Sequence, residues 1–302
     1  MFKRNLNLFV HFFIRQFLNM RLNFYLLKRF RKVYRDGVLY HLDLQKLIDM
    51  HIYLDSWEPE NIEVLKRILS SGDIVIEAGA NIGAHSLIMG NLIGPNGRLY
   101  AFEPTNYAFE KLDYLIKLNS LGSVITPERT VLSNHSGELP ITSMVSEFML
   151  FSTGDGVGED ISSSQVTSID NYVLLNNICS LKLIKIDVDG YDFKVLSGAL
   201  NSIANFRPII MIELADFTLK RQGDSINDII NFLHSQNYVG YYLSSPFGKN
   251  IWANKINNSE EVLIHSGATS HVDSLFLPVE NQGFFIIVFL RILEFVTTGI
   301  PL

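Results

Sequence analysis

The sequence predicts an α/β fold, a Rossmann-like, mostly parallel sheet with helices on both faces. Short apolar runs rich in β-branched residues alternate along the chain with segments of helical periodicity, as in successive βαβ units. Four of the apolar runs end in an acid, at Glu77, Glu103, Asp187 and Glu213. Because ligands of parallel sheets bind over the carboxyl ends of the strands, these four acids are predicted to share one site.

The expected elements follow from apolar spacing and from the glycine and proline turns between them. Strands are expected at 74–76, 98–102, 128–133, 183–188, 208–213, 238–243 and 274–277. Helices are expected at 56–70, 83–93, 107–119, 192–200 and 226–236. Ser56 is the expected N-cap of the first of these helices, with Pro59 in its first turn.

Composition narrows the class of protein. The 302 residues are 47% apolar, enough for one large domain with additions, and the one cysteine excludes a disulfide framework. Nine of the 25 Lys and Arg lie in residues 1–35, whereas all 31 Asp and Glu lie beyond them. The acidic body of the chain argues against nucleic acid as its main substrate.

The basic N-terminal stretch, residues 1–35, allows two interpretations. If residues 1–35 form one helix, every cation except Arg31 falls within an arc of roughly 160°. Such a helix would lie on an anionic membrane surface, or it would cap the domain with its apolar face. No uncharged run is long enough to span a bilayer, and no signal-peptide cleavage site follows. We therefore expect a cytoplasmic protein with possible peripheral contact at the inner face of a membrane.

Three segments divide the chain. Residues 1–55 are expected to form a basic amphipathic helical extension, and residues 56–280 the main domain. Residues 281–302 form an apolar tail, which is too short to cross a membrane and is expected to be a docking or an interfacial helix.

The turn over residues 77–83 predicts a nucleotide-like ligand. Gly79 and Gly83 bracket the turn, with Ala80 and Asn81 between them, and the amides of the following helix point above it. Glycine at position 79 is expected to let a ligand approach the main chain. Glu103, at the tip of the next strand, suits the paired hydroxyls of a ribose.

The residues of the turn favour S-adenosylmethionine (SAM) over a dinucleotide. A pyrophosphate site would have glycine where this chain has Asn81, and Glu77 is poorly placed beside a pyrophosphate. The same acid is well placed to hold the ammonium of a methionine moiety. A nicotinamide-dependent oxidoreductase remains the alternative, although Tyr191 and Lys194 are three residues apart rather than the four that a dehydrogenase pair needs.

Six stretches together resemble the FkbM family of SAM-dependent methyltransferases. They lie, in the order of the family, at residues 77–83, 101–104, 167–170, 185–190, 195–199 and 207–213. The resemblance implies a class I methyltransferase sheet of seven strands with the last antiparallel, and O-methylation of a sugar, glycan or other secondary metabolite. The family's usual acids are Asp where this chain has Glu77, and Glu where it has Asp189 and Asp192.

The predicted chemistry is methyl transfer to a hydroxyl that must lose its proton. Asp187 is expected to contact both the cofactor and the acceptor, and Asp189 or Glu213 to act as general base. Alternatively, these three acids hold a divalent cation, which we favour less than a site without metal. Ser133 and Asn134 are further candidates for cofactor binding. A third hypothesis is a non-catalytic SAM-binding protein at a membrane. The sequence identifies neither the methyl acceptor nor the oligomeric state.

Overall fold

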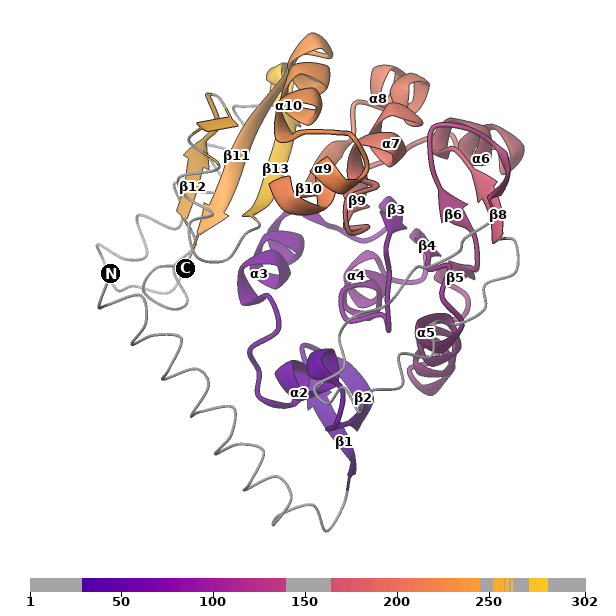
Figure 1. Ribbon diagram of the computed structural model, residues 1–302. Coiled ribbons are helices and arrows are strands. Elements are labelled where there is room, and N and C mark those ends of the chain that lie inside the picture. Colours follow the sequence, from indigo (N-terminus) through magenta and orange to yellow (C-terminus); the bar gives the residue numbers. More distant parts are fainter. Residues whose placement is uncertain are drawn as a thin grey trace, which may run out of the picture.

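The computed structural model describes residues 29–139, 164–244, 252–257, 259–260, 262 and 272–281. Within these residues the centre is an eight-stranded sheet (Figure 1). Its strands, in spatial order, are β12 (Trp252–Lys255), β11 (Tyr238–Ser244), β13 (Val272–Pro278), β10 (Ile209–Leu214), β9 (Leu183–Ile186), β3 (Ile74–Ala78), β4 (Arg98–Phe102) and β5 (Ile125–Glu128).

The sheet confirms the predicted class I methyltransferase arrangement. Strands β5, β4, β3, β9 and β10 pair in parallel, and β13 lies antiparallel between β10 and β11. The chain first builds outward from β3 to β4 and β5, and then returns to place β9 on the other side of β3. The carboxyl ends of β3 and β9 therefore flank the switch point, where open α/β sheets bind ligands. Six of the seven expected strands lie in this sheet, whereas the strand expected at 128–133 is wrong, because β5 ends at Glu128 and residues 131–132 pair in a separate small sheet; β12 is a further strand at the edge.

Helices cover both faces of this sheet. One face carries α3 (Pro59–Ile68), α4 (Ser86–Ile93) and α5 (Asn106–Leu118), whose apolar residues share one buried cluster with Val75, Leu99 and Leu183. The other face carries α6 (Ile169–Leu175), α7 (Asp192–Ser197), α8 (Leu200–Phe206), α9 (Asp216–Arg221) and α10 (Ile226–Ser235). A small sheet of β6 (Val131–Leu132), β8 (Ser164–Thr167) and β7 (Gly137–Leu139) stands beside β5, and the 3-10 turn η1 (Val279–Asn281) follows β13.

The expected N-terminal helix is wrong for residues 30–43, which form a hairpin. Strands β1 (Phe30–Arg35) and β2 (Val38–Asp43) pair antiparallel around Asp36 and Gly37. Both turn residues have positive φ, 47° and 80°, which makes a tight turn matched to the twist of the strands. Exposed and half-buried residues alternate along β1, as in a strand, and its cations fall on both faces. The remainder of the predicted helix, residues 1–28, lies outside the described residues.

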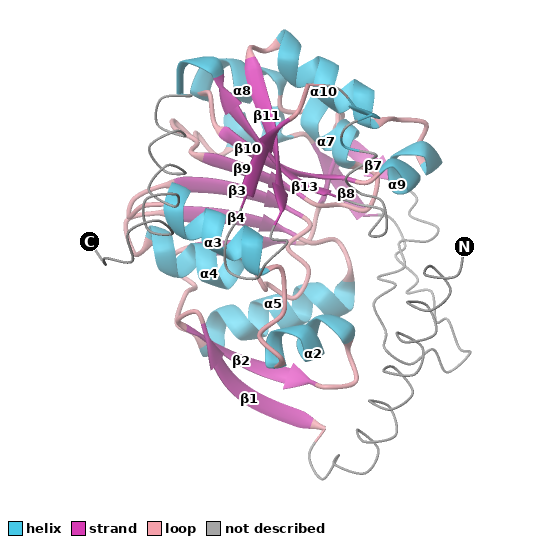
Figure 2. Cartoon of the chain, turned by 90° about the vertical axis from the view of Figure 1, so that its left-hand side faces the viewer, coloured by secondary structure: helices cyan, strands magenta, loops and turns pink. Residues whose placement is uncertain are grey.

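The hairpin belongs to the core of the domain. Val38, Tyr40 and Leu42 share the buried cluster of α3–α5, and the helix α2 (Leu47–Tyr53) adds Ile48 and Ile52. Figure 2 shows the hairpin and α2 below the α3–α5 layer, on the side away from the sheet. Residues 38–53 are therefore not a separate extension, although residues 1–55 were expected to form one. Nearly all of the predicted tail 281–302 lies outside the described residues.

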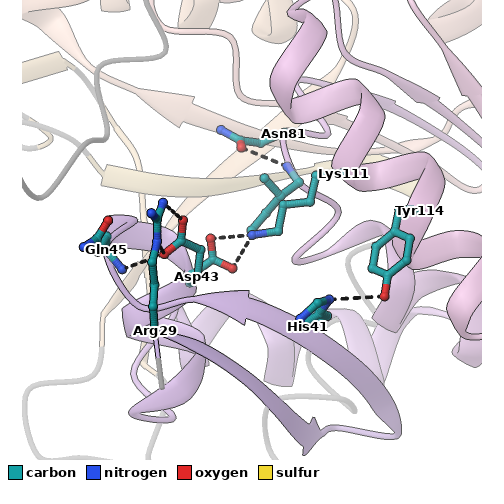
Figure 3. Close-up of polar contacts among 9 residues, drawn as sticks. Arg29, His41, Asp43, Gln45, Asn81, Lys111 and Tyr114 are labelled. Atoms are coloured by element: carbon teal, nitrogen blue, oxygen red, sulfur yellow. Dashed lines mark hydrogen bonds and ion pairs between the residues drawn. The ribbon is translucent and has the colours of Figure 1, made fainter. Parts of the chain in front are cut away.

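One ion pair lies within this N-terminal unit and another joins it to α5 (Figure 3). Arg29 donates to both oxygens of Asp43, at 2.7 and 2.5 Å. Lys111 of α5 pairs with the buried carboxylate of Asp49 in α2. No helix in the described part of the chain has both the length and the hydropathy needed to cross a bilayer.

Candidate active site

The glycine turn after β3 is bound to the end of the neighbouring strand β4. The amides of Gly79 and Ala80 both donate to the carbonyl oxygen of Phe102, at 3.0 and 2.9 Å. Gly79 has a φ of +84°, and a Cβ atom there would lie 1.8 Å from the carbonyl oxygen of Asp187. The close approach that requires glycine at position 79 is therefore made by the end of β9, a contact that the sequence analysis had assigned to a ligand. Gly83 has a φ of +89° and packs against Leu112.

Glu103, which directly follows β4, stabilises the same turn by hydrogen bonds. Its side chain accepts hydrogen bonds from the Asn81 amide at 2.9 Å, the Thr105 amide at 2.9 Å and the Thr105 hydroxyl at 2.5 Å. A carboxylate offers about four lone-pair positions, so Glu103 has room for roughly one further donor, such as one ribose hydroxyl. Burial raises the pKa of Glu103, while these three donors favour its charged form.

Glu77 is turned into the protein interior, toward Lys185. The two residues are register partners on β3 and β9, and Glu77 is 1% exposed. The Ser86 hydroxyl donates to Glu77 at 2.5 Å. Burial raises the pKa of Glu77 to about 7, although Lys185 and Ser86 act in the opposite direction. The ammonium-binding role predicted for Glu77 stays a prediction, because Ser86 and Lys185 already engage this carboxylate.

Lys185 supplies a buried positive charge beneath the strand ends. It is 3% exposed and donates to Asp187 at 2.9 Å. Burial alone would lower its pKa, but the carboxylates of Asp187, Glu77 and Glu58 outweigh burial and raise the pKa of Lys185. In the sequence Lys185 is recognisable only as part of a motif, so its charge interaction with the neighbouring acids was not predicted.

The three predicted catalytic acids are only partly brought together. Burial and the nearby charges of Asp187 and Asp273 raise the pKa of Glu213, which pairs in register with Asp273 of β13. Asp189 is exposed in the loop after β9, with a φ of +49°. Across the described residues, no three His, Cys, Asp or Glu side chains are grouped to hold a metal ion, so the divalent-cation alternative gains no support.

Asp192 organises the loop that carries Asp187 and Asp189. It is 1% exposed and accepts from the amides of Val188 at 3.2 Å and Gly190 at 2.9 Å. Burial and Asp187 raise the pKa of Asp192 to about 7. Asp192 therefore holds the backbone of this loop through two hydrogen bonds.

Ser133 and Asn134 follow β6, beside the central sheet rather than on it. Ser133 is buried, its amide donates to the Thr167 carbonyl at 2.9 Å, and its own carbonyl packs against Gly198. Asn134 is exposed and lies 3.0 Å from the ring nitrogen Nδ1 of His135. Their predicted contact with a cofactor stays a prediction.

Two further residues of this region were not selected from the sequence. Glu58 immediately precedes α3, and the charges of Asp273 and Asp187 act on it. His85 immediately precedes α4, and its Nε2 lies 3.4 Å from Glu58 Oε2. Ser56, the expected N-cap of α3, contacts His51 instead, and Glu58 occupies the N-cap position. No short motif joins these positions, so only the fold brings them together.

A cavity of about 480 Å³ lies on the other side of these two helix starts. Its walls include Tyr40 and Ile52 of the N-terminal unit, Trp57, and Ala84 and Ile88 near the start of α4. The four strand-end acids do not line it. It is therefore separate from the candidate site over the sheet.

Comparison with known proteins agrees with this arrangement. The hexuronic acid methyltransferase AglP of Haloferax volcanii is 24% identical over 154 residues, which are 51% of this chain and 61% of that protein. The methyltransferase sdnD of Sordaria araneosa is 35% identical over 74 residues, which are 24% of this chain and 28% of that protein. The chain thus covers less than two thirds of either relative.

One solved structure in the comparison is methyltransferase FkbM from Methylobacillus flagellatus KT. It is 15% identical with a TM-score of 0.45, and the alignment covers 73% of this chain and 51% of that one. The family match is broader, because residues 77–239, more than half of the sequence, match the methyltransferase FkbM domain. This match begins at the acid before the glycine turn and runs through β10 to β11. The chain therefore belongs to the FkbM methyltransferase family.

Proposed function

We propose that this protein is a SAM-dependent methyltransferase that methylates a hydroxyl of a sugar or a related small acceptor. The observation that carries the proposal is the glycine turn 77–83, joined to Glu103 at the switch point of the sheet. Such a turn places one acidic side chain, that of Glu103, where a nucleoside ligand of this fold class binds.

The charges over the strand ends fit a cationic methyl donor. The charges of Asp187 and Asp273 raise the pKa of both Glu58 and Glu213, and Lys185 supplies a positive charge beneath them. When bound, SAM supplies an activated methyl group on a positively charged sulfonium, together with an ammonium. Like-charged carboxylates gain from a nearby cation, because it favours their ionised forms.

The residues of the chain have separable roles in this proposal. Asp187 is one-third exposed at the end of β9 and held by Lys185, so it orients the reacting groups. Glu213 has a raised pKa, regains its charge when a cation lies beside it, and accepts the proton of the acceptor hydroxyl. Asp189, exposed in the adjoining loop, is the competing base.

Turnover separates the two candidate bases. Glu213→Gln should lower kcat by about 10²- to 10⁴-fold, the usual contribution of a general base. Asp189→Asn should change kcat far less. If Asp189→Asn has the larger effect, Asp189 is the base and our assignment of Glu213 is wrong.

The acceptor class rests on a relative rather than on the site. AglP is described as a hexuronic acid methyltransferase, which supports a sugar acceptor for this chain. Incubating the full chain with radiolabelled SAM and hexuronic acids, neutral hexoses and a catechol tests this class. We expect label on a sugar hydroxyl; label on the catechol alone, or on a sugar carboxylate as an ester, would contradict hydroxyl methylation of a sugar.

Cofactor identity is tested first and by itself. Calorimetry should show one molecule of SAM or S-adenosylhomocysteine binding per chain, and no binding of NADH or NADPH. The reverse result would support the oxidoreductase alternative. Membrane contact through residues 1–35 is a further proposal, tested by co-sedimentation of the full chain with anionic and neutral vesicles.

A further inference from the structure

Glu58 holds a strained position beside the strand-end acids. Its φ is +38°, in the left-handed region that glutamate rarely adopts, and proline follows it. The Asn61 side chain donates to Glu58 Oε2 at 2.7 Å and fixes the carboxylate. The side chain is 29% exposed, so it reaches solvent, and the charges of Asp273, Asp187 and Lys185 act on it.

His85 points a buried nitrogen at the same carboxylate. The residue is 4% exposed, and its Nε2 atom has no hydrogen-bond partner among the described residues. Nε2 lies 3.4 Å from Glu58 Oε2, too far and too poorly aligned for a good hydrogen bond. A buried polar atom without a partner destabilises the protein, so a ligand that bonds to it gains affinity. Burial and Lys185 lower the pKa of His85 to about 3, so the ring is neutral.

The pair lies at the end of the site opposite to Glu103. Glu103 accepts the Asn81 amide at the β4 side of the turn, whereas His85 follows the turn on α4 and is acted on by Lys185 and Asp187 of β9. If the ribose lies at Glu103, the amino acid end of the cofactor extends toward β9. Glu77, the other acid in reach, is already engaged by Ser86 and Lys185.

We propose that Glu58 and His85 bind the amino acid head group of the methyl donor. The Glu58 carboxylate accepts hydrogen bonds from the α-ammonium, and His85, in its neutral Nε2–H tautomer, donates to the α-carboxylate. The proposal rests on the proposed function, since it names residues for one end of the same cofactor. It predicts that both residues discriminate between ligands with and without the head group.

Two adenosine thioethers isolate that head group. S-Adenosylhomocysteine carries it and 5′-methylthioadenosine lacks it, while the sulfur of both is uncharged. In calorimetry with the full chain, Glu58→Gln should weaken S-adenosylhomocysteine by about 10- to 100-fold, the usual effect of losing a charge-assisted hydrogen bond. Methylthioadenosine should bind as it does to the wild type. Glu60→Gln, in the first turn of the same helix, is the matched control and should change neither ligand.

The outcomes separate this inference from the proposed function. Equal weakening of both ligands by Glu58→Gln, or no change in either, would overturn the head-group role. If the wild type binds neither ligand, the proposed function fails as well. His85→Leu tests the same claim independently should Glu58→Gln not fold, and it should again weaken S-adenosylhomocysteine but not methylthioadenosine.

Discussion

The two ends of the candidate site are built in different ways. At the β4 end, Glu103 accepts three hydrogen bonds from the chain itself, and the turn amides are bound to Phe102. At the β9 end, the charges of Asp187 and Asp273 act on Glu58 and Glu213, which come from other segments, and His85 leaves a buried nitrogen without a partner in the described structure. The first end is complete before any ligand arrives, whereas the second gains stability from a cationic one. We therefore expect the β4 end to recognise the shape of a ligand and the β9 end to recognise its charge.

The largest effect is expected from removing the positive charge at the β9 end. Lys185→Met removes the positive charge on which Glu77, Asp187 and Glu58 act. Breaking a buried ion pair in this way should lower the free energy of unfolding by about 3–5 kcal/mol. Urea denaturation followed by circular dichroism measures the change. Lys117→Met, which removes an exposed pair with Asp113, should cost less than about 1 kcal/mol. Equal losses in the two variants would mean that the acids are not balanced by Lys185.

A smaller loss of stability is expected at the turn. Gly79→Ala forces a side chain into left-handed backbone and against the Asp187 carbonyl, for a combined cost of about 2–4 kcal/mol. Gly122→Ala is the matched control, because open space surrounds that position. Thermal unfolding of both variants compares them, and a Gly79→Ala protein as stable as its control would show that β9 does not approach the turn this closely.

Glu103→Gln should weaken ligands without regard to their head group. It places an amide where three donors now converge, so the turn should shift and both S-adenosylhomocysteine and methylthioadenosine should lose about 10- to 100-fold in affinity. Calorimetry beside Glu58→Gln then gives opposite patterns for the two ends. A head-group-selective loss in Glu103→Gln would reverse our orientation of the cofactor.

The smallest effect is a dependence of SAM affinity on pH. The raised pKa of Glu77, about 7, means that this buried acid is protonated below neutral pH and ionised above it. A cationic ligand favours the ionised form, so SAM affinity should rise by up to about tenfold between pH 6 and 8. Methylthioadenosine, which carries no positive charge at its sulfur, should show a flat profile at the same ionic strength. Parallel profiles for the two ligands would contradict a charge-based β9 end.

Local sequence pattern predicted the parts of the molecule that depend on local structure. The run before Glu77, the glycines of the turn, and Glu103 and Asp187 at the ends of β4 and β9 lie where expected, because each is encoded within a few adjacent residues; Glu77 and Glu213 instead lie inside β3 and β10. The hairpin 30–43 was missed because its cations also fit a helical arc, and the Asp36-Gly37 turn was not weighed against that fit.

The β9 end of the site could not be predicted from the spacing of residues along the sequence. Glu58, His85 and Asp273 lie on three different elements, and nothing in their immediate neighbours marks them as a group. Lys185 was visible within a motif, but its pairing with Glu77 depends on the register between β3 and β9. Gly79 was identified correctly as a position that excludes side chains, yet the atom that excludes them belongs to Asp187.

A crystal structure of the full chain with S-adenosylhomocysteine tests the central claim most directly. We predict one ligand over the strand ends, with a ribose hydroxyl hydrogen-bonded to Glu103 and the amino acid head group between Glu58 and His85. A ligand in the reverse orientation, or one seated in the cavity beside Trp57 and Tyr40, would contradict the account.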